Sequence, residues 1–220
     1  MTISEQKALE KILEYLKDAA SVFLVGCSDC ATVVKTGGEP EVAQMAETLK
    51  ANGKTITGTM IGEPGCHLLN MKRQFREHKA ELDAADAVLV MSCGTGTQTA
   101  AMAVEQEKPV WAANNTLYLG QVERMGHFRE LCSACGDCTI DRTFAICPVT
   151  RCAKGLQNGP CGGTTAEGKC EVSPDRDCAW YLIYERMKGK SLESLREYVA
   201  PKDARLRPGL FPVTPEGEKK

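Results

Sequence analysis

The sequence has no apolar run of the ~18 residues that mark a membrane-spanning helix. Its first residues, Met1 to Lys7, also lack the basic segment followed by an apolar one that marks a secretory leader. We therefore expect no membrane span and a cytoplasmic location.

A strong excess of charge of either sign is absent as well. The 27 Lys and Arg residues are nearly balanced by 29 Asp and Glu, which leaves a net charge of -2. Binding to nucleic acid or to an anionic membrane relies on a basic surface. The composition gives no reason to expect either partner and favours a neutral or protein partner.

Catalytic side-chain patterns are missing too. No Ser-His-Asp set, paired carboxylates or phosphoryl-transfer motif can be argued from residue spacing, and the three histidines are scattered along the chain. Only His67, which follows Cys66, stands beside a residue with possible metal chemistry. We expect no hydrolytic or group-transfer chemistry from this chain itself.

Cysteine, in contrast, is abundant: there are 12 in 220 residues, and eight lie between Cys132 and Cys178. A C-x2-C-x2-C triplet opens this region and a Cys-Pro pair follows, as in ferredoxins. In a reducing cytosol, metal explains so many thiols better than disulfides do. We predict that two [4Fe-4S] clusters are held here by Cys132, Cys135, Cys138, Cys147, Cys152, Cys161, Cys170 and Cys178.

Zinc is the main alternative to clusters, because C-x2-C pairs also occur in four-cysteine zinc sites. A zinc ribbon presents two such pairs, whereas here the triplet is followed by single cysteines, and this spacing favours clusters. A disulfide framework is a weaker alternative. The sequence does not assign cysteines to clusters, since in two-cluster ferredoxins the Cys before Pro ligates the other cluster.

The first 125 residues alternate between helical and strand patterns. Such alternation predicts an α/β fold, a small Rossmann-like parallel sheet of about four strands with helices on its faces. We predict helices over Glu5 to Ala19, Glu39 to Asn52, Gly65 to Ala80 and Thr97 to Glu107, and strands over Ser21 to Gly26, Lys54 to Met60, Ala87 to Met91 and Pro109 to Ala113.

Four further cysteines follow the predicted strands. Since the carboxyl ends of parallel strands lie at one edge of a sheet, these thiols should converge there. We predict a third [4Fe-4S] site, with the amides of Gly26, Gly94 and Gly96 donating hydrogen bonds to its sulfides. Its ligands would be Cys27, Cys30, Cys66 and Cys93.

Two alternatives stay open for this edge, a four-thiolate zinc site and four buried thiols with no ligand. In addition, the turn from Cys93 to Thr99 is rich in glycine and resembles a phosphate-binding turn. It lacks the third glycine of a dinucleotide site and the Lys-Ser/Thr of a P-loop, so a bound nucleotide is the less favoured reading.

Residues 126–199 are predicted to form a Cys-rich, largely irregular, ferredoxin-like region that ends in helices. The segment up to Cys178 has few large apolar residues, so metal bonds must supply much of its folding free energy. Helical patterns cover Cys178 to Met187 and Ser191 to Val199, and Ala200 to Lys220 is expected to be an extended tail. The basic residues interleaved with the thiols would raise the potential of a nearby cluster; they are Arg142, Arg151, Lys154 and Lys169.

Several short motifs resemble one known family, the small iron-sulfur subunit (MetV type) of the two-subunit methylenetetrahydrofolate reductase of anaerobic bacteria. The most specific are Asn158-Gly159-Pro160-Cys161-Gly162-Gly163 and Cys170-Glu171-Val172. Others lie around Cys135 to Cys138, at Cys147-Pro148, and at Asn115 to Gly120. The family pattern has a further cysteine where this chain has Val34.

The resemblance implies a hetero-oligomer with a flavin subunit that binds FMN and reduces methylenetetrahydrofolate to methyltetrahydrofolate. This chain would then be a non-catalytic electron-transfer subunit that relays electrons to the flavin, and an electron-donating complex would be its further partner. Gly162 and Gly163 would let the backbone approach a sulfide closely. The alternative function is a zinc-stabilised docking subunit that links the reductase to an electron-donating complex.

Overall fold

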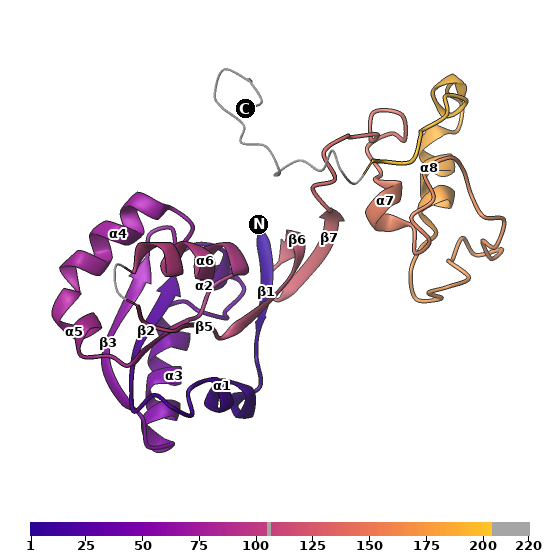
Figure 1. Ribbon diagram of the computed structural model, residues 1–220. Helices are drawn as coiled ribbons and strands as arrows, with labels where there is room; N and C mark the ends of the chain where they lie inside the picture. Colours follow the sequence, from indigo (N-terminus) through magenta and orange to yellow (C-terminus); the bar gives the residue numbers. More distant parts are fainter. Residues whose placement is uncertain (105–106, 204–220) are drawn as a thin grey trace. The chain divides into compact units, whose positions relative to one another are not determined.

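The computed structural model describes residues 1–104 and 107–203. It contains two compact units, the first comprising Met1–Phe128 and the second beginning at Arg129 (Figure 1). Each unit has its own buried core, so each is described by itself.

A four-stranded parallel sheet forms the centre of the first unit, as predicted. Its strands are β2 (Ser21–Cys27), β3 (Thr55–Gly62), β4 (Ala87–Val90) and β5 (Val110–Ala112), in the order β3-β2-β4-β5. Val22 to Val25 and all of β4 are completely buried, because helices cover both faces of the sheet. The sequence therefore reads as continuous apolar runs at these strands.

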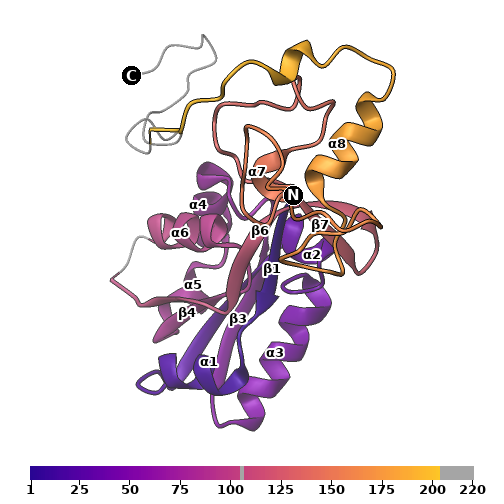
Figure 2. The same cartoon turned by 90° about the vertical axis from the view of Figure 1, so that its right-hand side faces the viewer.

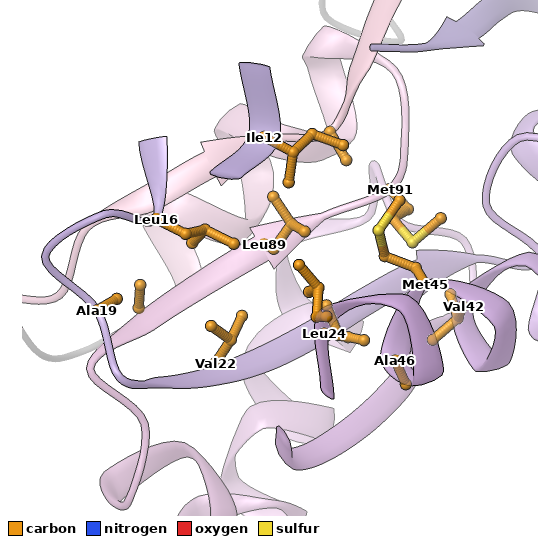
Figure 3. Packing of buried hydrophobic residues seen from close by; sticks show 13 residues of the cluster. Ile12, Leu16, Ala19, Val22, Leu24, Val42, Met45, Ala46, Leu89 and Met91 are labelled. Carbon is orange, nitrogen blue, oxygen red and sulfur yellow. The ribbon is translucent and has the colours of Figure 1, made fainter. Parts of the chain in front are cut away.

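Helices lie on the two opposite faces of this sheet (Figure 2). α1 (Leu9–Tyr15) and α3 (Glu39–Ala51) contribute to one apolar cluster, in which Leu16, Leu24 and Leu89 are fully buried (Figure 3). On the other face, α4 (Leu68–Glu77), α5 (Lys79–Asp83) and α6 (Gly94–Ala103) pack around Phe23 and Met71. The single-turn helix α2 (Cys30–Val33) follows β2 at the carboxyl edge.

Three predicted helices in this unit differ from the structure. The predicted helix over Glu5 to Ala19 is wrong at its start, because Thr2–Gln6 forms strand β1 and α1 begins only at Leu9. β1 pairs with a strand more than 100 residues away, and local periodicity does not report such a partner. The helix predicted from Gly65 begins at Leu68 and is interrupted at His78, and the one predicted from Thr97 begins earlier, at Gly94.

A second, antiparallel sheet was not predicted at all. It consists of β1, β6 (Asn114–Arg124) and β7 (His127–Cys132), in the order β1-β6-β7. β6 and β7 are joined by Met125 and Gly126, and Gly126 has φ +80°, a conformation that glycine adopts at little cost. Most side chains of β6 are exposed, so the strand has little of the apolar alternation by which strands are recognised.

The second unit contains little regular structure, as predicted. Its helices are the single turn α7 (Pro148–Arg151), α8 (Ala179–Met187) and a 3-10 turn at Glu193–Leu195. The predicted helix over Cys178 to Met187 is confirmed, whereas the one over Ser191 to Val199 is wrong, because only the 3-10 turn forms there. The predicted extended tail after Ala200 falls almost wholly in residues 204–220, which lie outside the described residues.

The buried core of the second unit is small. Its cluster holds Ile146, Cys178, Trp180, Ile183 and Met187, whereas the two clusters of the first unit hold thirteen and twelve buried residues. Apolar burial thus contributes much less stability here than in the first unit. Across the described ranges, no helix is long and apolar enough to cross a membrane.

Candidate metal centres

Three thiols converge at the carboxyl edge of the parallel sheet. Cys27 ends β2, Cys66 lies in the turn after β3, and Cys93 follows β4 and caps α6. Burial raises the pKa of the Cys66 thiol, and its electrostatic interactions with Cys27, Cys93 and Asp29 raise that pKa further. These four groups therefore lie close enough to interact electrostatically, as the topology predicts for three of them.

Glycine backbone packs directly around Cys27. A Cβ atom on Gly65 would lie 3.3 Å from the Cys27 sulfur, and the Cys27 amide donates to the carbonyl of Gly37 at 2.8 Å. A Cβ atom on Gly37 would overlap the carbonyl oxygen of Met91, at the end of β4. The loop after α2 thus contacts the carboxyl ends of both β2 and β4 and holds Cys27 in place.

Cys30, the fourth predicted ligand at this edge, is tied to β1. Its sulfur accepts a hydrogen bond from the amide of Thr2 at 3.4 Å. It stands at the first position of α2, three residues after Cys27. His67, the residue after Cys66, caps α4 by accepting a hydrogen bond from the Asn70 amide at 3.2 Å, which is a structural role.

The three glycines predicted to donate to this site have different surroundings. Gly26 leaves space for the Gly37 carbonyl and for Ile61, and Gly96 leaves space for the Ser92 hydroxyl. The Gly94 amide donates to the hydroxyl of Thr116 in β6 at 2.7 Å. Both Gly94 and Gly96 lie in the first turn of α6, where amides have no partner within the helix.

Four thiols of the second unit surround a single cavity. The cavity holds only about 20 Å³ of free space, roughly enough for one water molecule. Its lining contains Cys152, Cys161, Cys170 and Cys178, together with Lys154, Gly163, Thr164, Glu171, Ala179 and Trp180. Sequence spacing did not single out this set among the eight cysteines.

A short hairpin brings two of these thiols together. Lys169 and Asp177 form an antiparallel bridge, with the Cys170 amide donating to Arg176 and the Cys178 amide donating to Gly168. Alternate residues of a strand point to opposite faces, so Cys170 and Cys178 share one face of the hairpin. Lys169 and Asp177 form an ion pair of 2.7 Å on the other face.

Polar groups inside the cavity contact its sulfurs. The Thr164 hydroxyl donates to the sulfur of Cys178 at 3.1 Å. Glu171 accepts from Lys154 and from the thiol of Cys161, the latter at 3.3 Å, and these bonds hold the pKa of Glu171 below its usual value. Lys154 is therefore the predicted cation that lies beside the thiols.

Gly162 and Gly163, the two glycines after Cys161, differ in their surroundings. Gly162 has φ +87°, and a Cβ atom on it would meet nothing within 4 Å. A Cβ atom on Gly163 would overlap the carboxyl group of Glu171. Gly163 thus makes room for the carboxylate that lines the cavity.

The other four cysteines of this unit lie around the triplet loop and the start of α7. Ala134 and Gly136, between the triplet cysteines, have φ of +51° and +88°, and the Ala134 amide donates to the Cys132 sulfur at 3.3 Å. Lys202 donates to the sulfur of Cys135 at 2.8 Å and lowers the pKa of that thiol. Cys147 is the residue before α7.

The remaining predicted cations have partners or neighbours of their own. Arg142 pairs with Glu197 at 3.1 Å. Burial lowers the pKa of Arg151, and the like charges of Arg129, Arg176 and Arg186 lower it further. Asp177 acts in the opposite direction and raises the pKa of Arg151.

All twelve cysteines are free thiols. Within the described part of the chain, no three His, Cys, Asp or Glu side chains come close enough together to hold a single metal ion. The thiols of the second unit are instead spread around a cavity.

Comparison with known proteins places the second unit in a metabolic context. Residues 111–205 match the family model described as methylene-tetrahydrofolate reductase C terminal. The matched segment begins in β5 and includes all eight cysteines from Cys132 to Cys178. This part of the chain is thus similar to the C-terminal part of methylene-tetrahydrofolate reductase, an enzyme of one-carbon metabolism. No curated protein and no solved structure matches the chain.

Three residues of these sites were missed by reasoning from the sequence. Glu171 and Thr164 lie beside the cysteines but are common residue types with no spacing rule of their own. Lys202 is 67 residues from Cys135, the thiol it contacts. A basic residue at that separation gives no sequence signal of proximity.

Proposed function

We propose that this chain is the iron-sulfur electron-transfer subunit of a methylenetetrahydrofolate reductase. It would carry electrons to the FMN of a partner subunit, which reduces methylenetetrahydrofolate to methyltetrahydrofolate. The single observation that carries the proposal is the cavity lined by four thiols in the segment related to that reductase. The residue motifs that resemble the small reductase subunit support the same assignment.

The spacing of the thiols favours clusters over zinc. Four sulfurs on one zinc ion stand about 4 Å apart, because each Zn–S bond is about 2.3 Å long. A [4Fe-4S] cluster places iron and sulfide between the thiolates, which must then surround a larger space. Four of the described thiols line one cavity, and the sequence spacing, one triplet followed by single cysteines, favours clusters.

The chain's own residues would hold and tune the clusters. Cys152, Cys161, Cys170 and Cys178 would supply thiolates in the cavity, and the Thr164 hydroxyl would donate a hydrogen bond to one of them. Bound clusters would supply one-electron transfer. Lys202 places positive charge beside the Cys135 sulfur, which favours the reduced and more negative state of a cluster there, whereas Glu171 offsets the charge of Lys154 in the cavity.

The sheet edge of the first unit is proposed as the third cluster site. Cys27, Cys66 and Cys93 interact there, and Cys30 is the nearest further thiol along the chain. The amides in the first turn of α6 begin next to Cys93 and would face the anionic cluster with the positive end of the helix dipole.

Metal analysis of protein purified without oxygen tests the proposal. We expect about twelve iron and twelve acid-labile sulfide per chain for three clusters. About eight of each would confine the clusters to the second unit and contradict the third site. Zinc with little iron would overturn the electron-transfer function and favour the docking subunit.

Reconstitution tests the division of labour. The isolated chain should be reduced by a low-potential donor but should not convert methylenetetrahydrofolate by itself. Addition of the flavin subunit should restore the reaction, and a cluster-free preparation should not support it. Reductase activity in the flavin-free chain would contradict the proposal.

A further inference from the structure

We propose that the eight cysteines of the second unit bind two clusters in chain order, so that the first four cysteines hold one cluster and the last four hold the other. One set is Cys152, Cys161, Cys170 and Cys178, and the other is Cys132, Cys135, Cys138 and Cys147. The inference rests on the proposed function for the identity of the metal. It differs from the two-cluster ferredoxin pattern, in which the cysteine before proline ligates the other cluster.

The short helix α7 separates the two sets. Cys147 precedes its first residue and Cys152 follows its last. A helix of four residues is about 6 Å long, so these thiols stand at opposite ends of it. Cys152 packs against the core around Ile183 and lines the cavity, whereas Cys147 does not line it.

The members of the cavity set are held by independent contacts. The hairpin bridged at Lys169 and Asp177 places Cys170 and Cys178 on one face. Glu171, the next residue in that hairpin, contacts the thiol of Cys161. Trp180 lines the cavity, and its Nε1 donates a hydrogen bond to the carbonyl of Leu156 at 2.9 Å. Leu156 stands four residues after Cys152, so this bond holds the segment that follows Cys152 beside the cavity.

A different contact attaches Cys147 to the triplet. The Thr150 hydroxyl donates to the carbonyl of Leu131 at 3.1 Å, which ties α7 to the residue before Cys132. Thr150 stands three positions after Cys147, the residue that precedes α7. The triplet loop starts directly after Leu131 and contains two left-handed residues, Ala134 and Gly136.

Iron counts in double variants test the partition. Each single change to alanine at Cys138, Cys147 or Cys170 should lower the iron content by about four per chain. Cys138→Ala with Cys147→Ala should still lose about four, because both thiols serve one cluster, whereas Cys147→Ala with Cys170→Ala should lose about eight. The reverse result, about eight for the first pair and about four for the second, would establish the crossed pattern and overturn the partition.

Hydrogen exchange of the α8 amides tests the same partition in variants that are partly unfolded. Loss of Cys170 should deprotect the amides of α8, which Cys178 precedes, whereas loss of Cys138 or Cys147 should leave α8 protected. Equal loss of α8 protection in all three variants would contradict the partition. If the wild-type protein contains iron and the double variants show the crossed counts, the partition is wrong but the proposed function stands. Wild-type protein with zinc alone would overturn the proposed function.

Discussion

At the scale of single residues, charge beside sulfur is the main means by which this chain would tune a cluster. Lys202 contacts the Cys135 sulfur, and Lys154 reaches the thiol cavity through Glu171. Neither lysine is deeply buried, so solvent screens part of its effect. The effect on potential should therefore be measurable but modest.

Replacement of Lys202 by Met should lower the potential of the cluster held by the triplet. Loss of an exposed charge interaction of about 0.2–1 kcal/mol corresponds to about 10–40 mV for a one-electron couple. A redox titration followed by EPR measures the shift. The matched control is Lys190→Met, since Lys190 lies over the ring of Phe144 at 4.8 Å instead of beside a thiol. An unchanged or higher potential in the Lys202 variant would contradict this role.

Asp86 gives a pH-dependent prediction for the first unit. Its carboxylate accepts from the amides of Ser21 and Ala20 at 2.8 and 2.9 Å, and these bonds, the Ser21 amide first, lower its pKa. A carboxyl group with a lowered pKa stabilises the fold above its ordinary pKa of 3.8, and this stability is lost as the pH falls through the folded-state value.

The unfolding free energy of the first unit should accordingly fall between about pH 5 and pH 3, and fall less in Asp86→Asn. Hydrogen exchange of the β2 amides in increasing urea reports this quantity for the first unit alone. An identical pH dependence in Asp86→Asn would show that the two hydrogen bonds do not stabilise the ionised form.

At the scale of elements, loops and strand ends position the thiols. Gly37 illustrates this, because its carbonyl accepts from the amide of Cys27 while its Cα packs on the end of β4. The parallel strands and the helix over Glu39 to Asn52 were predictable, since local apolar patterns report them. The antiparallel sheet was not predictable, because β1 and β6 are short or exposed and stabilise each other across more than 100 residues.

Gly37→Ala should destabilise the first unit by about 3 kcal/mol or more, since the added methyl group overlaps the Met91 backbone, which can relieve the clash only by moving the strand. Gly94→Ala is the matched control, because its nearest neighbour would be the Thr116 hydroxyl at an ordinary 3.4 Å. Urea denaturation of both variants measures the difference. Equal stability of the two would mean that the loop rearranges without cost.

At the scale of the whole chain, the two units depend on different sources of stability. The first buries two large apolar clusters, and the described part of the second buries one small cluster around Trp180 and Ile183. Metal binding would supply the missing folding free energy of the second unit. The units should therefore respond differently when metal is removed.

Removal of metal by oxidation and chelation should unfold residues 129–203 and leave residues 1–128 folded. We expect amide protection in α8 to fall by at least about 100-fold, equivalent to about 2.8 kcal/mol, with protection in β2 and β4 nearly unchanged. Hydrogen exchange with mass spectrometry measures both regions in one sample. Retained protection in α8 would show that apolar packing alone folds the second unit.

The sequence by itself determined the parallel sheet, the placing of Cys27, Cys66 and Cys93 at its carboxyl edge, and the thiol-rich nature of the second unit. These features follow from local periodicity, strand order and residue type, which need no knowledge of distant partners. Only the tertiary structure decided that Cys152, Cys161, Cys170 and Cys178 share one cavity, and that Lys202 contacts Cys135. Such groupings depend on turns with left-handed residues and on contacts between distant segments. An irregular segment has no periodic sequence pattern that predicts where its side chains point.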